Sequence, residues 1–396
     1  MKREDVVLKK PERFSGEYKI PEKKINDAIN RVLKKLESKI DIYTDGFPKA
    51  ATNGTEYIVG ENNNWVCGMH TGCFLLSYEL SGEQKFLDVA KNHIPTYKTR
   101  LDKEIGIHDH DVGFAYSPSC VAMYKLFGDE LAKECALRAA NYLYDHSYFE
   151  KGGFIMRISS KPYDKSCCRT MMDTLMNIAL LYWTGEVTGD KKFTDAANAQ
   201  IRTTDNYLIR EDSSSYHHYQ FEPGSFKPLY GVTLQGNRDE STWSRGHSWG
   251  VLGLPIAYTY SGDEKLLALH KNVTYYFLNH LPEDLLPYWD FDFIDGDEPR
   301  DSSAAVISVC GMLEAAKYLP DSAPEKKVYK TAAAKILEAV IDKCSYETGD
   351  NFAGLIGHVT GAKPQGIGID ACAVYGDYFY LEALMRYVNP DWKRYW

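Results

Sequence analysis

A helix that ends in Gly, followed by a second helix that begins with Asp or Glu, recurs along this chain and limits its possible folds more than any other feature. Three copies read Gly128-Asp-Glu, Gly189-Asp-Lys and Gly262-Asp-Glu, and a fourth reads Gly82-Glu-Gln. Glycine accommodates the left-handed backbone that closes a helix, and an acidic residue at the next helix start offsets the helix dipole. A fifth copy has Pro320 in place of Gly. The repeat predicts helical hairpins at irregular spacing.

Apolar periodicity predicts about twelve helices and few strands. The expected helices cover 22–40, 66–80, 84–100, 112–126, 130–147, 170–187, 190–210, 244–260, 263–280, 302–318, 325–345 and 369–388. Apolar, aromatic helices alternate with more polar ones, as the inner and outer helices of a double ring require. The sequence therefore favours an all-α (α/α)6 barrel, a double toroid of six hairpins, over a linear solenoid. We expect one domain over residues 1–396, with residues 1–20 as an N-terminal extension.

The composition argues against several classes of function. A net charge of −9 disfavours a nucleic-acid surface, and no apolar run reaches the length of a membrane span. The first residues contain no apolar signal core, so we expect a cytoplasmic protein, or a periplasmic one if a signal peptide was removed. The nine Cys form no CxxC pair and are expected to be buried free thiols in a reducing compartment. A monomer or homodimer is expected.

Polar and aromatic residues precede each of the apolar helices. The N-termini of the inner helices of a closed ring open on one face, so these residues should meet on one rim. Aromatic rings that stack on sugar faces, beside carboxylates that hold hydroxyls, are typical of a carbohydrate site. The segments are Asn62–His70, His108–Phe114, Arg169–Asp173, Ser241–Trp249, Tyr288–Ser303 and Gly366–Asp370, and a long polar loop, Ser213–Asp239, is expected to serve the same site.

Asp173 lies within the apolar segment Lys165–Trp183. Burial disfavours the charged form of a carboxyl group, so we expect a raised pKa for Asp173, which suits a general acid. An internal cap or ion pair is the alternative. A helix cap is the favoured interpretation of Asp301. Arg245 is expected to hold a substrate carboxylate, with an ion pair to a neighbouring Asp as the alternative.

His108 and His110, with Asp109 and Asp111, form a weak metal-binding pattern. No third ligand follows at a diagnostic spacing, so we expect no metal. The sequence contains no phosphate-binding loop and no dinucleotide fingerprint, and no organic cofactor is expected.

Several segments between Trp65 and Tyr387 together resemble the unsaturated glucuronyl hydrolases, glycoside hydrolase family 88. They are His110–Phe114, Asp173–Asn177, Gly231–Gly236, Ser241–Trp249, Asp301–Ala304 and Tyr375–Ala383. The resemblance implies an (α/α)6 barrel. It also implies an enzyme that removes a 4,5-unsaturated glucuronic acid from the non-reducing end of oligosaccharides made by polysaccharide lyases, of glycosaminoglycan type, by hydrating a vinyl ether.

The same resemblance implies roles for individual residues. Asp173 would be the general acid/base, which protonates C4 and activates the water that adds at C5, and Asp111 would be the second essential carboxylate. Lys363 and Arg157 are hypothesised to bind a sulfate or a second uronate. The other substrate contacts implied are Trp65, His110, His217, Gly231, Thr233, Gln235, Trp243, Arg245 and Trp249.

The chain departs from the family pattern at three places. His247 stands where the family often has Gln, Met156-Arg157-Ile158 where many members carry a Trp, and Gly361–Gly366 where some carry a Ser-rich loop. These departures bear on the leaving sugar and its sulfation. An unsaturated rhamnogalacturonyl hydrolase, an inverting glycosidase acting on saturated oligosaccharides and a glycan-binding barrel without catalysis are the alternatives.

Overall fold

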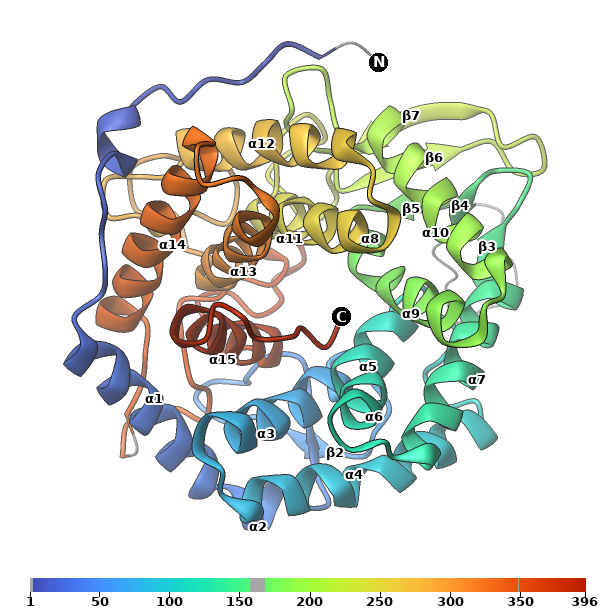
Figure 1. The fold of residues 1–396 in the computed structure, drawn as a ribbon, viewed down its shortest axis with the longest axis vertical. Helices are drawn as coiled ribbons and strands as arrows, with labels where there is room; N and C mark the ends of the chain where they lie inside the picture. Colours follow the sequence, from blue (N-terminus) through green and yellow to red (C-terminus); the bar gives the residue numbers. More distant parts are fainter. Residues whose placement is uncertain (1–2, 157–167, 348) are drawn as a thin grey trace.

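Two concentric rings of helices form the protein, which confirms the predicted all-α barrel (Figure 1). The computed structural model describes residues 3–156, 168–347 and 349–396. The inner ring contains α3 (Cys67–Ser81), α5 (Val112–Tyr116) continued by η2 (Ser117–Val121) and α6 (Ala122–Phe127), α8 (Thr174–Asn177) with α9 (Ala179–Thr188), α11 (Ser244–Ser261), α13 (Ser302–Tyr318) and α15 (Val374–Val388). The outer ring contains α1 (Glu22–Glu37), α4 (Gln84–Asp102), α7 (Glu130–Ser147), α10 (Lys191–Thr203), α12 (Glu264–Asn279) and α14 (Pro324–Lys343).

The glycine turns adopt the predicted conformation. Gly82, Gly128, Gly189 and Gly262 close inner helices with φ values of 72°, 67°, 73° and 66°. After three of these glycines an Asp side chain caps the next helix: Asp129 accepts a hydrogen bond from the backbone N of Ala132, Asp190 from that of Lys192 and Asp263 from that of Lys265. The repeat therefore sets the hairpin geometry through local backbone chemistry.

Burial separates the two rings as the sequence pattern predicts. Inner helix α13 is buried around most of its circumference, whereas outer helix α10 buries a stripe that includes Phe193, Ala197 and Ile201. A helix that packs between its neighbours and an outer ring needs apolar side chains on most faces, and a helix at the surface needs them on one.

Short strands lie outside the rings. β1 (Phe47–Pro48) pairs with β2 (Val59–Gly60), and β3 (Tyr148–Phe149) with β4 (Phe154–Ile155). β5 (Arg169–Met171), β6 (His218–Phe221) and β7 (Pro228–Val232) form an antiparallel sheet in that order. The remaining short elements are η1 (Pro11–Phe14), α2 (Ile40–Tyr43), η4 (Thr204–Leu208) and η5 (Lys363–Gln365).

Two predicted helix starts were wrong. The helix expected at 170 begins at Thr174, because residues 169–171 pair as a strand with residues 218–220. The helix expected at 369 begins at Val374, because Ala371 pairs with Val359 in an extended bridge. In both places a distant segment offers backbone hydrogen bonds that local periodicity does not reveal.

The first described residues of the chain form an arm on the outside of the ring. The backbone N of Lys9 donates to Asn279 Oδ1 at 2.8 Å, Arg13 Nη1 donates to the Leu281 carbonyl at 2.9 Å, and Thr331 donates to the Gly16 carbonyl at 2.7 Å. The arm thus crosses from α12 to α14 (Figure 1).

The last residues of the chain form a tail that returns to the centre of the inner ring (Figure 1). Lys125 on α6 donates to the Tyr395 carbonyl at 3.0 Å, and Trp396 Nε1 donates to Glu382 on α15 at 2.9 Å. Trp392 Nε1 donates to Glu79 on α3 at 3.2 Å. The tail therefore joins inner helices from opposite ends of the sequence.

Across the described residues, none of the helices has both the length and the apolar character of a membrane span. Eight cysteines of the described ranges are buried free thiols, and Cys167 lies outside those ranges.

Candidate active site

Asp111 and Asp173 lie at the starts of two neighbouring inner helices, α5 and α8. The backbone N of Phe114 donates to Asn177 Oδ1 at 2.8 Å, which ties the two helix starts together. Gly113 makes this contact possible, because a Cβ atom there would lie 2.4 Å from Asn177 Cα. Two predicted catalytic carboxylates, 62 positions apart in sequence, are thus brought to one place on the N-terminal rim of the inner ring.

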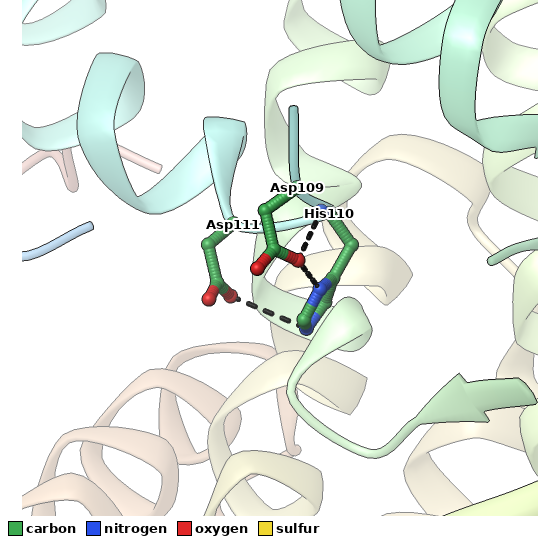
Figure 2. A group of neighbouring side chains, drawn as sticks. All are labelled: Asp109, His110 and Asp111. Atoms are coloured by element: carbon green, nitrogen blue, oxygen red, sulfur yellow. Dashed lines mark hydrogen bonds and ion pairs between the residues drawn. The ribbon is translucent and has the colours of Figure 1, made fainter. Parts of the chain in front are cut away.

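His110 joins these carboxylates. Its Nε2 atom lies 3.2 Å from Asp173 Oδ1 and 3.3 Å from Asp111 Oδ1. Its Nδ1 atom is bonded to Asp109, and the side chain of His110 is about 1% exposed. Figure 2 shows the ring between Asp109 and Asp111. Both ring nitrogens face carboxylate oxygens, so the arrangement fits an imidazolium that donates from both sides.

The expected raised pKa of Asp173 was wrong. Burial alone would raise it, but His110 and His217 hold the pKa of Asp173 well below its ordinary range. Burial disfavours a charge on His110, yet Asp111, Asp109 and Asp173 together raise the pKa of that imidazole well above its ordinary value. In the protein without substrate, Asp173 is therefore a carboxylate beside an imidazolium.

Asn177 is a site residue to which the sequence reasoning gave no role. Its Nδ2 atom lies 3.4 Å from Asp111 Oδ1 and 3.2 Å from the Asp173 carbonyl. It is fully buried. The four-residue step from Asp173 to Asn177 puts both on one helix face, and this spacing was the available signal.

His217 and Trp243 stand on the other side of Asp173. His217 Nε2 lies 3.9 Å from Asp173 Oδ2, and the ring centres of His217 and Trp243 are 4.5 Å apart. Trp243 is 3% exposed, and its indole Nε1 has no hydrogen-bond partner within the described part of the chain. A buried N–H of this kind is available to a ligand oxygen.

Trp65 forms part of an aromatic cluster on the same rim. Its ring stacks on Tyr375 at 5.3 Å and lies 5.5 Å from Phe114, three residues after Asp111. Trp65 is half-buried. Trp65 therefore lies on the rim that carries Asp111, and its implied contact with the substrate stays a prediction.

Arg245 forms an ion pair with an Asp, which was the alternative expectation for this residue. Its Nη1 donates to Asp301 Oδ2 at 2.7 Å, its Nη2 donates to the Gly361 carbonyl at 2.7 Å, and the group is 3% exposed. The guanidinium also lies over the rings of Trp243 and Tyr375. The ion pair given as the alternative for Arg245 is therefore present, because a buried guanidinium needs partners of its own, and a contact with a substrate carboxylate stays a prediction. Asp301 caps α13 through the Ser303 backbone N, as predicted.

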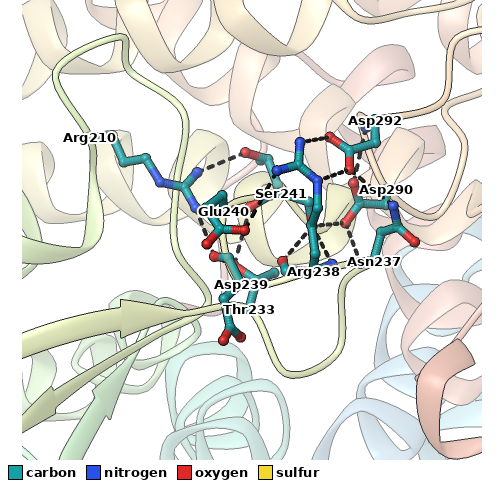
Figure 3. Close-up of polar contacts among 10 residues, drawn as sticks. Arg210, Thr233, Asn237, Arg238, Asp239, Glu240, Ser241, Asp290 and Asp292 are labelled. Carbon is teal, nitrogen blue, oxygen red and sulfur yellow. Dashed lines mark hydrogen bonds and ion pairs between the residues drawn. The ribbon is translucent and has the colours of Figure 1, made fainter.

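Thr233 and Gln235 lie on a loop that several hydrogen bonds hold in place. Thr233 donates to the carbonyls of Asp239 and Ser241 at 3.1 and 3.2 Å. Figure 3 shows the loop held by Asp290, which accepts from Ser241 Oγ at 2.6 Å, while Arg238 pairs with Asp292 and Arg210 donates to the Ser241 carbonyl. The Thr233 hydroxyl therefore stabilises the loop.

Gly231 and Gln235 lie on either side of Thr233 in the sequence. Gln235 Nε2 lies 3.5 Å from the Gly361 carbonyl, which links the loop to the segment before α15. A Cβ atom at Gly231 would lie 2.3 Å from the Tyr216 ring, so only glycine fits there.

Trp249 and His247 lie away from the acid pair. Trp249 is 2% exposed, and its ring centre lies 5.2 Å from that of Phe114, so it packs in the core, and its expected role as a substrate contact stays a prediction. Six residues of helix place it about 9 Å deeper than Trp243 along the axis of α11. His247 Nε2 donates to the Val273 carbonyl on α12 at 2.8 Å and faces the outer ring.

Lys363 is paired with Glu298 and lies 5.1 Å from the Trp289 ring centre. Glu298 also accepts from Trp289 Nε1 at 2.8 Å. Lys363 is therefore at the rim but is already engaged, and Arg157, the other hypothesised sulfate ligand, lies outside the described residues.

The four suspected metal ligands do not all meet at one site. His108 faces away from His110, with Tyr142 bonded to its Nδ1 and Glu104 3.8 Å from its Nε2. Ligand atoms of Asp109, His110 and Asp111 lie within 4.8 Å of one another. Both nitrogens of His110 already face carboxylates, and a metal would need one of them as an unprotonated donor, so these residues do not fit a metal.

A helical double ring whose N-terminal rim carries a carboxylate pair, an imidazole and stacked aromatic rings defines a carbohydrate-processing enzyme. Residues 39–385 match the family described as Glycosyl Hydrolase Family 88. The chain belongs to this family and is a glycoside hydrolase.

The relatives extend over the whole chain. A curated protein of Streptococcus agalactiae, an unsaturated chondroitin disaccharide hydrolase, is 39% identical over 392 residues, which cover 98% of this chain and 97% of the relative. The crystal structure of an unsaturated glucuronyl hydrolase from S. agalactiae has a TM-score of 0.95 at 38% identity and covers 100% of both chains. A mutant of that enzyme complexed with dGlcA-GalNAc6S has a TM-score of 0.87 at 36% identity, also with 100% coverage of both.

Proposed function

We propose that this chain releases 4,5-unsaturated glucuronic acid from the non-reducing end of glycosaminoglycan-type oligosaccharides made by lyases, and that unsaturated chondroitin disaccharides are its substrates. The observation that carries the proposal is the convergence of Asp111 and Asp173 on one nitrogen of His110, at distances of 3.3 and 3.2 Å. Full-length similarity to an unsaturated chondroitin disaccharide hydrolase supports the substrate class.

The proposed reaction is hydration of the vinyl ether. Asp173 delivers a proton to C4, and positive charge develops at C5, where the carboxylate of Asp111 stabilises it. Asp173 then takes a proton from the water that adds at C5, and the hemiketal opens with loss of the leaving sugar. Trp243 Nε1, which is buried, and the ring of Trp65 are placed to contact the sugar.

Similarity along the whole chain to enzymes named for unsaturated substrates disfavours the inverting alternative, which acts on saturated oligosaccharides. Asp111 and Asp173 each place one carboxylate oxygen beside the same nitrogen of His110. In the proposed reaction both groups act on one double bond.

Turnover is tested by the loss of the ultraviolet absorbance of the conjugated double bond. We expect decay with unsaturated chondroitin disaccharides and at least a hundredfold slower decay for Asp173→Asn, which removes the acid but keeps the shape of the side chain. Asp102→Asn, at an ion pair on outer helix α4, is the matched control and should retain activity.

Three outcomes of this experiment would contradict the proposal. Binding without decay in the wild type would favour a glycan-binding barrel. Decay only with unsaturated rhamnogalacturonan fragments would move the activity to the rhamnogalacturonyl group. Release of sugar only from saturated oligosaccharides would favour an ordinary glycosidase.

We propose that the single catalytic domain works in a reducing compartment such as the cytoplasm, as a monomer or homodimer. Eight buried free cysteines in the described ranges support a reducing compartment, because an oxidising compartment favours paired cysteines.

A further inference from the structure

The mechanism above leaves one acidic residue of the site without a role. Asp109 Oδ1 accepts a hydrogen bond from the backbone N of His110 at 2.7 Å and is bonded to His110 Nδ1. The side chain of Asp109 is 35% exposed and that of Asp173 is 14% exposed. His110 therefore connects a carboxylate near solvent with the buried acid. Asp109 is bonded to one ring nitrogen, as Figure 2 shows, and Asp173 lies 3.2 Å from the other.

The mechanism also requires a proton donor. Asp173 must be protonated to deliver a proton to C4, but in the protein without substrate it is ionised beside His110. The protein must bring a proton to Asp173 once the sugar is bound. Among the described residues, His110 Nε2, at 3.2 Å from Oδ1, is the nearest group placed to supply it.

We propose that Asp109 is a positioning residue that holds His110 as an imidazolium, and that His110 passes its Nε2 proton to Asp173 during the reaction. The inference rests on the proposed function and deepens it, because it assigns the source of the proton that C4 receives.

The proton transfer balances over one turnover. The Nε2–H bond of His110 breaks as an O–H bond forms on Asp173 Oδ1, and His110 keeps its Nδ1 proton, donated to Asp109. Asp173 then gives the proton to C4. Water loses a proton to Asp173 as its oxygen bonds to C5, and this proton returns from Asp173 to His110 Nε2. One water is consumed, and the protein recovers its initial protonation state.

The charges around the ring favour this arrangement. Asp109 and Asp111 face His110 from its own loop, and Asp173 faces it from the start of α8. His217, from the segment before β6, faces the other oxygen of Asp173 at 3.9 Å. Three carboxylates around one buried imidazole stabilise its charged form, and the pKa of His110 is raised against the effect of burial.

Asp109→Asn separates the charge of this residue from its shape. The amide oxygen can still accept from the His110 backbone, but the negative charge is lost, so the pKa of His110 falls. Since the imidazolium is the active form, the alkaline limb of the kcat profile should move to lower pH by about one unit. At pH values above both limbs, kcat should fall about tenfold while KM changes by less than about twofold. Asp109→Glu, which keeps the charge, should restore the limb in part.

Glu104→Gln is the matched control. Glu104 lies on the same loop and faces His108 at 3.8 Å, so this variant removes one negative charge from beside a histidine that does not contact Asp173. Its alkaline limb should coincide with that of the wild type. Identical limbs for Asp109→Asn and the wild type, or an equal shift in Glu104→Gln, would overturn the inference.

A direct readout keeps the inference testable if Asp109→Asn does not fold. Ring 15N shifts of His110, assigned with His110→Gln, should show both nitrogens protonated in the wild type at pH 7.5 without substrate, and a neutral ring would overturn the inference. Failure of the proposed function looks different: the wild type would then leave the absorbance of every unsaturated disaccharide unchanged.

Discussion

The role of His247 could be inferred only from its burial in the folded protein. Its Nδ1 faces Ser215 Oγ at 3.1 Å and its Nε2 faces the Val273 carbonyl, so both nitrogens are used inside the protein. Burial lowers the pKa of His247 to about 4. The departure from the family at this position therefore affects stability and not the recognition of the leaving sugar.

His247→Gln should change how stability depends on pH. The pKa of histidine is about 6.5 in the unfolded chain, and the pKa of His247 in the folded protein is about 4. The contribution of His247 to stability is therefore present above pH 6.5 and is lost as the pH falls toward 4. The free energy of unfolding of the variant should fall less steeply between these values, by up to about 1.4 kcal/mol per pH unit. Urea unfolding from pH 7 to pH 4.5 measures the slope.

His146→Gln, at an exposed position of α7, is the control for this prediction and should retain the wild-type slope. Equal slopes for His247→Gln and the wild type would show that His247 does not titrate as the structure implies.

Individual site residues were predicted unevenly for a physical reason. Asp111 and Asp173 were found because their residue type and motif carry the chemistry. The ionisation of Asp173 was predicted wrongly, because it depends on His110, 63 positions away, whose distance is set by the fold. The ion pair of Arg245 could be given only as an alternative for the same reason, since its partner Asp301 is 56 positions away.

At the scale of elements, the contact between α5 and α8 decides the geometry of the acid pair. Gly113→Ala should destabilise the protein by about 1–3 kcal/mol, because the new methyl group would overlap Asn177 and push the helix starts apart. Activity should fall further than stability alone requires, since Asp111 and Asp173 are carried on these helices. Thermal unfolding and absorbance decay, measured below the melting temperature, separate the two effects.

Gly60→Ala provides the comparison, because a Cβ atom there meets nothing within 4 Å. It should leave both measurements near wild type. A Gly113→Ala variant with wild-type kcat would contradict the proposed role of the α5–α8 contact.

Helices were easier to predict than the short strands that lie between them in the sequence. The glycine turns and acidic caps are local, and most helix bounds followed from them. Strand β5 was missed because residues 169–171 find their partners on β6, about 50 residues later, and sequence periodicity carries no information on such pairing.

At the scale of the whole molecule, the closed ring followed from counting alternating helices, whereas the tail across its centre did not.

Arg386 on α15, fully buried, pairs with Glu314 on α13 and with Glu382. Arg386→Met should cost about 3–5 kcal/mol of unfolding free energy, since two buried carboxylates lose their cation. Denaturant unfolding measures the loss.

Arg138→Met, at an exposed ion pair with Asp102, is the control and should leave the unfolding midpoint almost unchanged. A wild-type midpoint for Arg386→Met would show that the network at this end of the ring does not hold the helices together.

The tail also affects how the protein can be made. Glu79 on α3 is among the first inner-ring residues to leave the ribosome, but its partners Trp392 and Tyr395 follow 313 and 316 positions later. Contacts so distant in sequence form late, because loop-closure entropy opposes them until the intervening chain has folded. Until translation reaches these residues, the apolar inner helices have an open edge, so the nascent chain depends on protection from aggregation for nearly its whole synthesis.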